Sequence, residues 1–214
     1  MDSITPQLPA PSPSPSCSPA HRARSHVTRL VHHILLLLVL HQLIGSEFMR
    51  FPFPGEAPSR TFSLHEYLGM ANLAIVAAFW VWAIVRRGET RLGRLLPWFS
   101  IASLTEVLTD FSAQLRRLAH GRAPDDENGA FASAVHGLGL LAVTAMALSG
   151  LVFFIADGTS IARLALRLHK QIANLVWAYL FIHAGLAALH HLLGSDILSR
   201  MFWVSTRRHG GRRR

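Results

Sequence analysis

The segment "LHKQIANLVWAYLFIHAGLAALHHLLGSDILSRM" (residues 168–201) combines the composition of a membrane span with an unusual number of imidazoles. Its four histidines are His169, His183, His190 and His191. No Asp, Glu, Lys or Arg occurs from residue 171 to residue 195, and about 20 apolar residues suffice to cross a bilayer as a helix. Ionisable side chains are costly inside a membrane, so they usually mark a functional site. This segment is therefore predicted to be a transmembrane helix that carries the chemistry of the protein.

Three further windows also lack charged residues, in a chain that has 50% hydrophobic residues and a mean hydropathy of +0.31. The four windows are Leu30–Ser46, Tyr67–Val85, Asn128–Ala156 and Gln171–Ser195. Together they predict an all-α integral membrane four-helix bundle. Its helices are expected at about Val27–Phe48, Ser63–Arg86, Ala130–Ile155 and Leu168–Leu193.

A further helix is predicted between the second and third spans, in "SLTEVLTDFSAQLRRLAHG" (residues 103–121). Its apolar residues fall on one helical stripe. They are Leu104, Val107, Leu108, Phe111, Leu115 and Leu118. Ser103 and Glu106 have the spacing of a capping box, and Gly121 is a plausible stop. Such an amphipathic helix can lie on the inner membrane face or pack on its own protein, and the pattern suits both.

Lysine and arginine are distributed unequally between the two sides of the predicted bundle. With a cytoplasmic N-terminus, sixteen of the 21 lie in cytoplasmic segments and five lie outside. Cytoplasmic loops are enriched in positive residues, so both termini are predicted to be cytoplasmic. The net charge of +9 is then mainly a topology signal. The basic tail "RRHGGRRR" is expected to contact anionic lipid, and no nucleic-acid partner is predicted.

Composition divides the chain into three parts. Residues 1–24 form a leader rich in proline and serine that is predicted to be disordered. Residues 25–201 hold the four-helix domain, and residues 202–214 form the basic tail. The one cysteine, Cys17, excludes both a disulfide framework within the chain and covalent haem attachment through a CxxCH motif. A haem in this protein would be held by coordination and packing alone.

The spacing of the histidines separates the possible chemistries. His169 and His183 are 14 residues apart on one predicted helix, so they share a face and lie about 21 Å apart along the axis. That distance is too long for two ligands of a single metal ion, but it suits two cofactors stacked across the bilayer. His65 begins the second span on the same outer side as His169, so these two can share one iron.

The histidine pairing on the inner side stays open at this stage. His32 lies near the inner start of the first span, and His183, His190 and His136 are all candidates to face it. A haem iron has two axial positions that imidazole fills well. The geometry therefore suits two bis-histidine b-type haems, one near each membrane face. His136, His190 and His191 are also candidates for contacts with a haem or a quinone.

Several motifs resemble those of the bacterial cytochrome b561 family, which is related to the cytochrome b subunits of hydrogenases and formate dehydrogenases. The resemblance covers roughly residues 25–201. It rests on "RLVHH" with "EF" after it, "HEYLG", "VHGLGLL" with a later "LSG", and "HKQIAN" followed by "IHAGLAALHH" and a D…RM ending. It implies two haem b groups. Their iron ligands would be His32 with His183 on the inner side and His65 with His169 on the outer side.

The resemblance further implies electron transfer across a bacterial inner membrane. Some members of the family oxidise superoxide outside and reduce ubiquinone, which would make this protein an oxidoreductase. The cationic outer residues would then attract the anion. They are Arg60, Arg163, Arg167 and Lys170. One alternative is a membrane subunit that passes electrons for a soluble dehydrogenase or hydrogenase. Another is a haem-free, histidine-rich metal transporter, which the lack of Asp and Glu in the third and fourth spans disfavours.

Two positions depart from the family pattern. His33 stands where the family often has a tryptophan, and Phe79 stands where an arginine is common in the second span. The loop between the second and third spans is also longer than in compact members. These departures concern the contacts of the haem carboxylates and any substrate site.

Overall fold

The computed structural model describes residues 25–52, 56–85, 92–122 and 129–193, and within these ranges it is helical without strands. The helices are α1 (His26–Glu47), α2 (Arg60–Val85), α3 (Leu92–Leu95), α4 (Ile101–Ala119), α5 (Ala130–Ile155) and α6 (Ser160–Leu192), with a 3-10 turn at Pro97–Phe99. Four of them, α1, α2, α5 and α6, are long and apolar enough to cross a membrane. The prediction of an all-α protein with four spans is confirmed. The leader and the basic tail lie outside the described residues.

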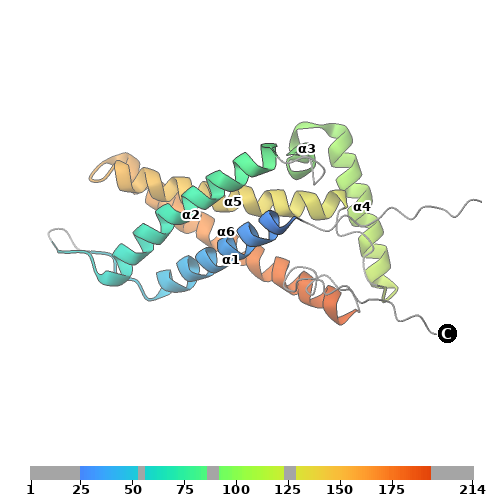
Figure 1. Cartoon of the computed structure of the whole chain (residues 1–214), viewed down its shortest axis with the longest axis horizontal. Coiled ribbons are helices and arrows are strands. Elements are labelled where there is room, and N and C mark those ends of the chain that lie inside the picture. Colours follow the sequence, from blue (N-terminus) through green and yellow to red (C-terminus); the bar gives the residue numbers. More distant parts are fainter. Residues whose placement is uncertain (1–24, 53–55, 86–91, 123–128, 194–214) are drawn as a thin grey trace, which may run out of the picture.

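The four long helices form an up-and-down bundle (Figure 1). The link between α1 and α2 and the link between α5 and α6 lie at the same end, and α4 lies across the opposite end. α1 packs on α2, α2 on α5, and α5 most extensively on α6. The backbone of α6 has only sparse contact with α1 and α2. This leaves space for side chains between α6 and the first two helices.

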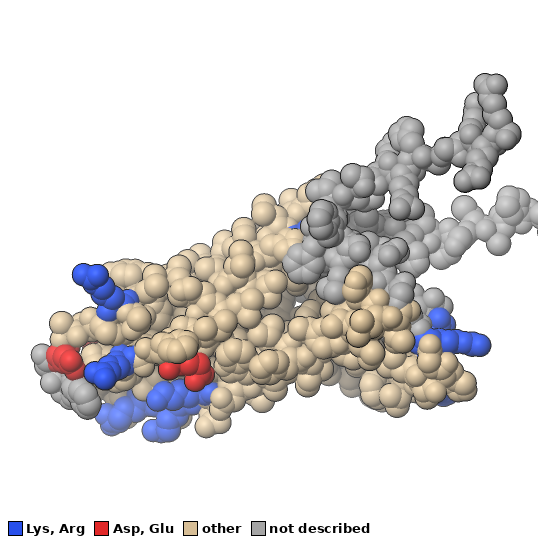
Figure 2. Space-filling view, turned by 90° about the horizontal axis from the view of Figure 1, so that it is seen from below, with Lys and Arg blue, Asp and Glu red and all other residues tan. Residues whose placement is uncertain are grey.

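Charged side chains gather at the two ends of the molecule (Figure 2). The long middle of the face shown is formed by uncharged residues. Large apolar side chains of the long helices are exposed, among them Leu37, Val81 and Phe181 at 68%, 61% and 68% of their surface. An uncharged apolar belt between two charged ends matches the hydrocarbon core of a bilayer and its headgroup layers. The protein is a multi-pass membrane protein.

Two spans begin earlier than their hydropathy predicts. α6 begins at Ser160 rather than Leu168, because the Thr159 hydroxyl accepts the Ala162 N–H at 3.2 Å and caps the helix. Its 33 residues give a length of about 50 Å, which exceeds a hydrocarbon core of about 30 Å. α2 begins at Arg60, where Ser59 accepts the Phe62 N–H at 3.3 Å. Hydropathy detects only the apolar part of a helix, so the charged first turns were missed.

The predicted capping box of the amphipathic helix is wrong. α4 begins at Ile101, and its cap is Ser100, whose hydroxyl accepts the Ser103 N–H at 3.4 Å. The 3-10 turn Pro97–Phe99 directly precedes it and leaves Ser100 extended, which is the backbone geometry of a cap. The far end behaves as predicted, since α4 stops at Ala119 and Gly121 has a φ of +66°.

α4 is fixed to the protein along one side only. Asp110 Oδ2 accepts the Phe131 N–H at 2.9 Å, and the rings of Phe111 and Phe131 lie 5.0 Å apart. Asp110 thereby supplies a cap for α5, whose own N-cap is a glycine without a side chain to do so. Ile101, Leu108 and Leu115 are exposed on the other side of the stripe. One side of α4 therefore packs on the protein itself. Contact of its exposed side with lipid stays a prediction.

Two tryptophans of α2 tie the helices together through their indole N–H groups. Trp80 donates to the Thr144 hydroxyl of α5 at 3.0 Å, and Trp82 donates to the Thr28 hydroxyl of α1 at 3.2 Å. Hydrogen bonds between helices help to hold membrane bundles together. They hold α2 between α1 and α5 and so set the positions of the histidines on all three.

Candidate functional site

His65 of α2 and His169 of α6 face each other at the end of the bundle that carries the α1–α2 and α5–α6 links. Their ring centres are 6.1 Å apart and their planes are nearly perpendicular, at 84°. A metal–imidazole bond is about 2.0 Å long and a ring nitrogen lies about 1.1 Å from its ring centre, so two imidazoles on opposite sides of one metal have centres about 6.2 Å apart. The observed spacing fits two axial ligands of one iron.

The Nδ1 atom of His169 is held by α5. It lies 2.9 Å from the carbonyl oxygen of Met146 and 3.2 Å from the hydroxyl of Ser149. A carbonyl can only accept, so Nδ1 carries the proton and Nε2 carries the lone pair that a metal needs. Gly150 leaves the room for this ring, because a Cβ there would lie 3.3 Å from the His169 Cε1. His169 is therefore held in the tautomer of a metal ligand.

His65 is fixed through its backbone. The buried Gln42 of α1 donates from Nε2 to the His65 carbonyl oxygen at 2.8 Å. The His65 Nδ1 is buried, and the described residues offer it no hydrogen-bond partner. A buried polar atom without a partner costs free energy, and a bound cofactor would reduce that cost. The pair thus combines one imidazole that hydrogen bonds hold with one imidazole that has an unpaired buried nitrogen, which suits a shared metal ion.

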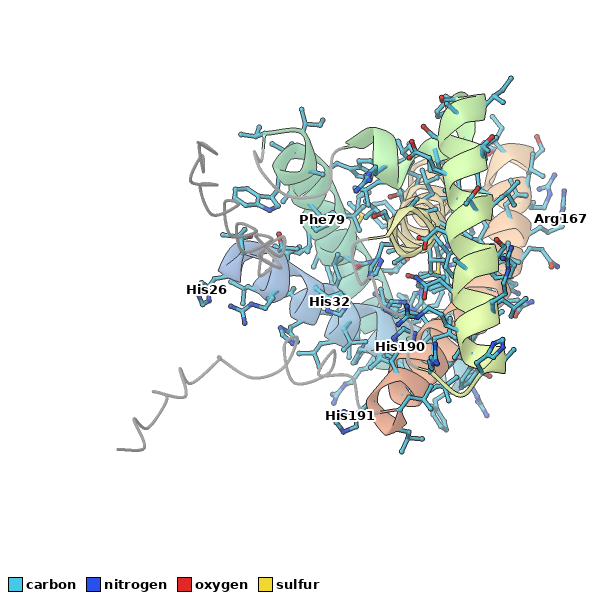
Figure 3. All side chains as sticks on the ribbon, turned by 90° about the vertical axis from the view of Figure 1, so that its right-hand side faces the viewer. His26, His32, Phe79, Arg167, His190 and His191 are labelled. Carbon is cyan, nitrogen blue, oxygen red and sulfur yellow. The ribbon has the colours of Figure 1, made fainter. Side chains whose placement is uncertain are left out.

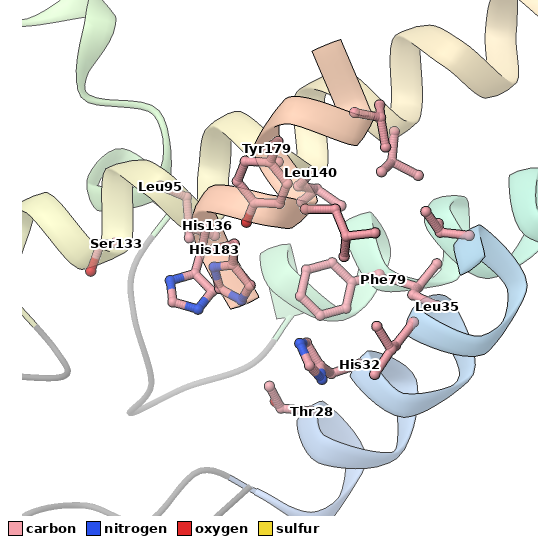
Figure 4. Close-up of a pocket in the computed structure, with 16 residues that line it drawn as sticks. Thr28, His32, Leu35, Phe79, Leu95, Ser133, His136, Leu140, Tyr179 and His183 are labelled. Carbon is pink, nitrogen blue, oxygen red and sulfur yellow. The ribbon is translucent and has the colours of Figure 1, made fainter. Parts of the chain in front are cut away.

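A cavity of about 170 Å³ lies toward the other end of the bundle. Its histidines are His136 of α5, His183 of α6 and His32 of α1. Figure 4 shows His136 and His183 side by side on one wall and His32 across the cavity, near Phe79 of α2. Most of the remaining wall is aliphatic, and none of the described residues that line the cavity is charged. Apolar walls with a few converging polar groups suit a large flat cofactor.

The wall with two histidines is ordered by ring contacts. The ring centres of His136 and His183 are 5.2 Å apart at 84°, and Tyr179 stacks on His183 at 5.3 Å and 13°. The Tyr179 ring lies where a side chain of Gly139 would be, since a Cβ there would meet its ring atoms. His136 Nδ1 lies 2.6 Å from the Ala132 carbonyl oxygen, which leaves Nε2 with the lone pair. Two imidazoles therefore lie on the wall opposite His32.

The remaining predicted contact residues lie outside the cavity lining. His190 is half-buried and His191 is exposed at the end of α6 (Figure 3). The cavity wall itself departs from the family pattern at one position. Phe79, which stands where the family often has an arginine, lies in this wall. His33 contacts the edge of the His32 ring, with centres 5.9 Å apart. The cavity wall thus has an aromatic ring where the family pattern has a cation.

A packed apolar core separates the two histidine sites. It is formed by Val39, Leu43, Met146 and Val176, which are each at most 8% exposed. Val176 lies halfway between His169 and His183 along α6. Within the described ranges, His, Cys, Asp and Glu form no group of three or more that could hold a metal ion. What the helices offer instead is imidazoles facing each other across gaps at two levels of the bundle.

Four supporting contacts were not found from the sequence. They are those of Gln42, Met146, Ser149 and Tyr179. Gln42 and Ser149 could have been noticed as polar residues inside apolar spans. A backbone carbonyl such as that of Met146 leaves no signal in a sequence. The stacking of Tyr179 leaves only an indirect signal in the sequence, which is the small residue Gly139 on the facing helix.

The histidines at both levels suit a haem, since the hydrogen bonds of His169 and His136 leave each with an Nε2 lone pair, and the cavity walls are mostly apolar. The family model described as prokaryotic cytochrome b561 matches residues 23–203. In the comparisons with curated proteins and with solved structures, nothing matches the chain. A match over most of the chain agrees with four membrane-length helices and with the facing histidines. The chain therefore belongs to the prokaryotic cytochrome b561 family, and it is a membrane cytochrome b that binds b-type haem and takes part in electron transfer.

Proposed function

We propose that the protein holds two b-type haems and passes electrons between the two sides of the bacterial inner membrane. The observation that carries this proposal is the facing pair His65 and His169, at the ring spacing of two axial ligands. The second pair is His32 with His183, on opposite walls of the cavity. Haem supplies reversible one-electron chemistry when bound. The chain supplies the ligands, the apolar walls and the separation of the sites from water.

The core between the two sites gives the bundle a defined route for electrons. His169 and His183 lie on one helix, and the buried core between the two sites is formed by the apolar residues Val39, Leu43, Met146 and Val176. Close packing keeps the surroundings of this core fixed, so little reorganisation accompanies a change of charge. Electrons therefore pass within one chain and need no mobile carrier.

Ubiquinone is the proposed partner in the lipid phase. The spans expose wide apolar surfaces to the membrane, where a lipid-soluble quinone is dissolved. His190 is half-buried and His191 exposed at the end of α6, near the level where a quinone headgroup would lie. These imidazoles are proposed to contact either the quinone or the edge of a haem.

The quinone proposal predicts rapid reoxidation of the reduced haems. Purified protein should contain two non-covalent haem b groups per chain, both low-spin in the reduced-minus-oxidised spectrum. A short-chain ubiquinone added without oxygen should oxidise both, because they are in electronic contact. Stopped-flow absorbance measures the rate, and a quinone analogue with a saturated, redox-inactive ring is the control. Protein without haem would overturn the cytochrome proposal, whereas haems that ubiquinone leaves reduced would overturn only the quinone.

The electron donor is proposed to be a small anion, with superoxide as the candidate. Arg163, Arg167 and Lys170 are exposed along one face of the first turns of α6, on both sides of His169 in the sequence. Figure 2 shows Lys and Arg side chains gathered at one end of the molecule, where acidic residues accompany them. Clustered cations raise the local concentration of an anion, and salt weakens that effect.

Replacing Arg163, Arg167 and Lys170 together by glutamine should slow the reduction of the haems by a superoxide pulse. The rate should fall by about three- to tenfold at low ionic strength and the salt dependence should flatten, because the attraction is electrostatic. Pulse radiolysis followed at the haem Soret band measures the rate. Arg94→Gln, an exposed arginine on α3, is the matched control and should react like the unchanged protein. No reduction by superoxide in the unchanged protein would discard this donor and leave the haem proposal intact.

A further inference from the structure

Ser149 shares an acceptor with the ligand His169. Its hydroxyl donates to the Met146 carbonyl oxygen at 2.8 Å, and His169 Nδ1 donates to the same oxygen at 2.9 Å. The distance from the hydroxyl oxygen to Nδ1 is 3.2 Å, so the three polar atoms form one closed group. Met146 is 5% exposed and Ser149 is half-buried. The group is therefore shielded from bulk water.

The geometry of α5 builds this group locally. Ser149 lies three residues after Met146, which lets its side chain reach back to that carbonyl. Gly150 follows and leaves the space into which the His169 ring enters. Nothing comparable is found at His65, whose Nδ1 lacks a hydrogen-bond partner among the described residues. The two proposed ligands of this iron thus differ: hydrogen bonds from α5 hold the His169 ring, and the described residues make no such bond to the His65 Nδ1.

The hydrogen bond on the outer nitrogen of a ligand imidazole affects the metal. A stronger bond from Nδ1–H to a carbonyl makes the ring a better electron donor, which stabilises the oxidised iron and lowers its midpoint potential. A carbonyl that already accepts from a hydroxyl is a weaker acceptor for a second donor. The Ser149 hydroxyl therefore weakens the bond between His169 and Met146. The longer contact of Nδ1 with the hydroxyl oxygen, at 3.2 Å, is the lesser effect.

We propose that Ser149 is a positioning residue that raises the midpoint potential of the haem held by His65 and His169, by competing with His169 for the Met146 carbonyl. This inference rests on the proposed function, because it requires a haem at that pair. Its consequence is directional: the serine makes this haem easier to reduce and so assists the entry of an electron from a donor.

The test is a redox titration of Ser149→Ala in full-length protein in nanodiscs. The alanine variant should keep both haems and lower the midpoint potential of one. The expected change in its reduction equilibrium is about three- to tenfold, or about 30–60 mV at 59 mV per tenfold for one electron. The other haem is an internal reference and should not move. Ser149→Thr should restore the original value, because threonine can make the same hydrogen bond to the carbonyl.

Ser46→Ala is the matched control. Ser46 also donates to a carbonyl three residues earlier in a span, that of Leu43 at 2.8 Å, but no contact joins it to a proposed ligand among the described residues. An unchanged potential in Ser149→Ala with both haems present would overturn this inference. So would an equal shift in Ser46→Ala, because it would show a general effect of the substitution. Absence of a haem at this site from the unchanged protein would instead overturn the proposed function.

Discussion

Alanine at His169 should remove one haem and leave the other, and alanine at His65 should give the same spectrum. The two imidazoles face each other at 6.1 Å, and in our proposal both would hold the same haem. Alanine at His32 or at His183 should remove the complementary haem, which belongs to the cavity. The haem content per chain, from the pyridine haemochrome spectrum, should fall from two to one in all four variants.

The pairing is tested by the pattern among the variants. His41→Ala serves as the control, because His41 is exposed on α1 and is half a helical turn out of phase with His32. It should keep both haems. Loss of different haems in His65→Ala and His169→Ala would overturn that pair. If His183→Ala keeps both haems, while His136→Ala or His190→Ala loses the one in the cavity, then the ligand opposite His32 is that other histidine.

Alanine at Gly139 should disturb the cavity haem without touching a ligand. The added Cβ would meet the Tyr179 ring, which cannot retreat freely because it stacks on His183. Overpacking of this kind costs about 1–3 kcal/mol, and here it would be relieved by moving the His183 ring. We expect most of the cavity haem to be lost or to become high-spin, as seen by electron paramagnetic resonance. The haem at His65 and His169 should be unchanged.

Gly185→Ala is the control for this substitution. Gly185 is also a glycine inside a span, but a Cβ there would have no atom within 4 Å. It should keep both haems with unchanged spectra. If a Gly139→Ala variant also keeps both haems, the Tyr179 and His183 rings can move together. That result would contradict our conclusion that this wall is tightly packed.

Several parts of the fold followed from sequence patterns because they depend on local chemistry. α5 begins and ends where it was predicted. Its residues carry no charge, and Gly129 directly precedes it as the N-cap. The 14-residue spacing of His169 and His183 placed them at two levels of α6, where the structure has them at separate sites. The early start of α6 was missed because its first turns carry Arg163 and Arg167, which hydropathy excludes from a span.

Other features depend on the way in which helices meet, and so could not be predicted. The sequence allowed three histidines opposite His32, and the structure brings two of them, His136 and His183, to the same wall. The carbonyl of Met146 acquires its role only when α5 and α6 pack together. The hydrogen bonds of Trp80 and Trp82 to threonines of the neighbouring helices likewise arise only when the helices pack.

The sparse contact of α6 with α1 and α2 has a consequence for the biogenesis of the protein. Each proposed iron joins α6 to one of the two helices that its backbone scarcely touches. Without the cofactor, α6 is held mainly by α5, and the buried Nδ1 of His65 has no hydrogen-bond partner among the described residues. Metal coordination then completes the assembly, as it does in other proteins where ligation contributes to folding. We therefore expect newly inserted chains without the cofactor to be cleaved more readily by membrane proteases, so that less of the protein accumulates when haem is scarce.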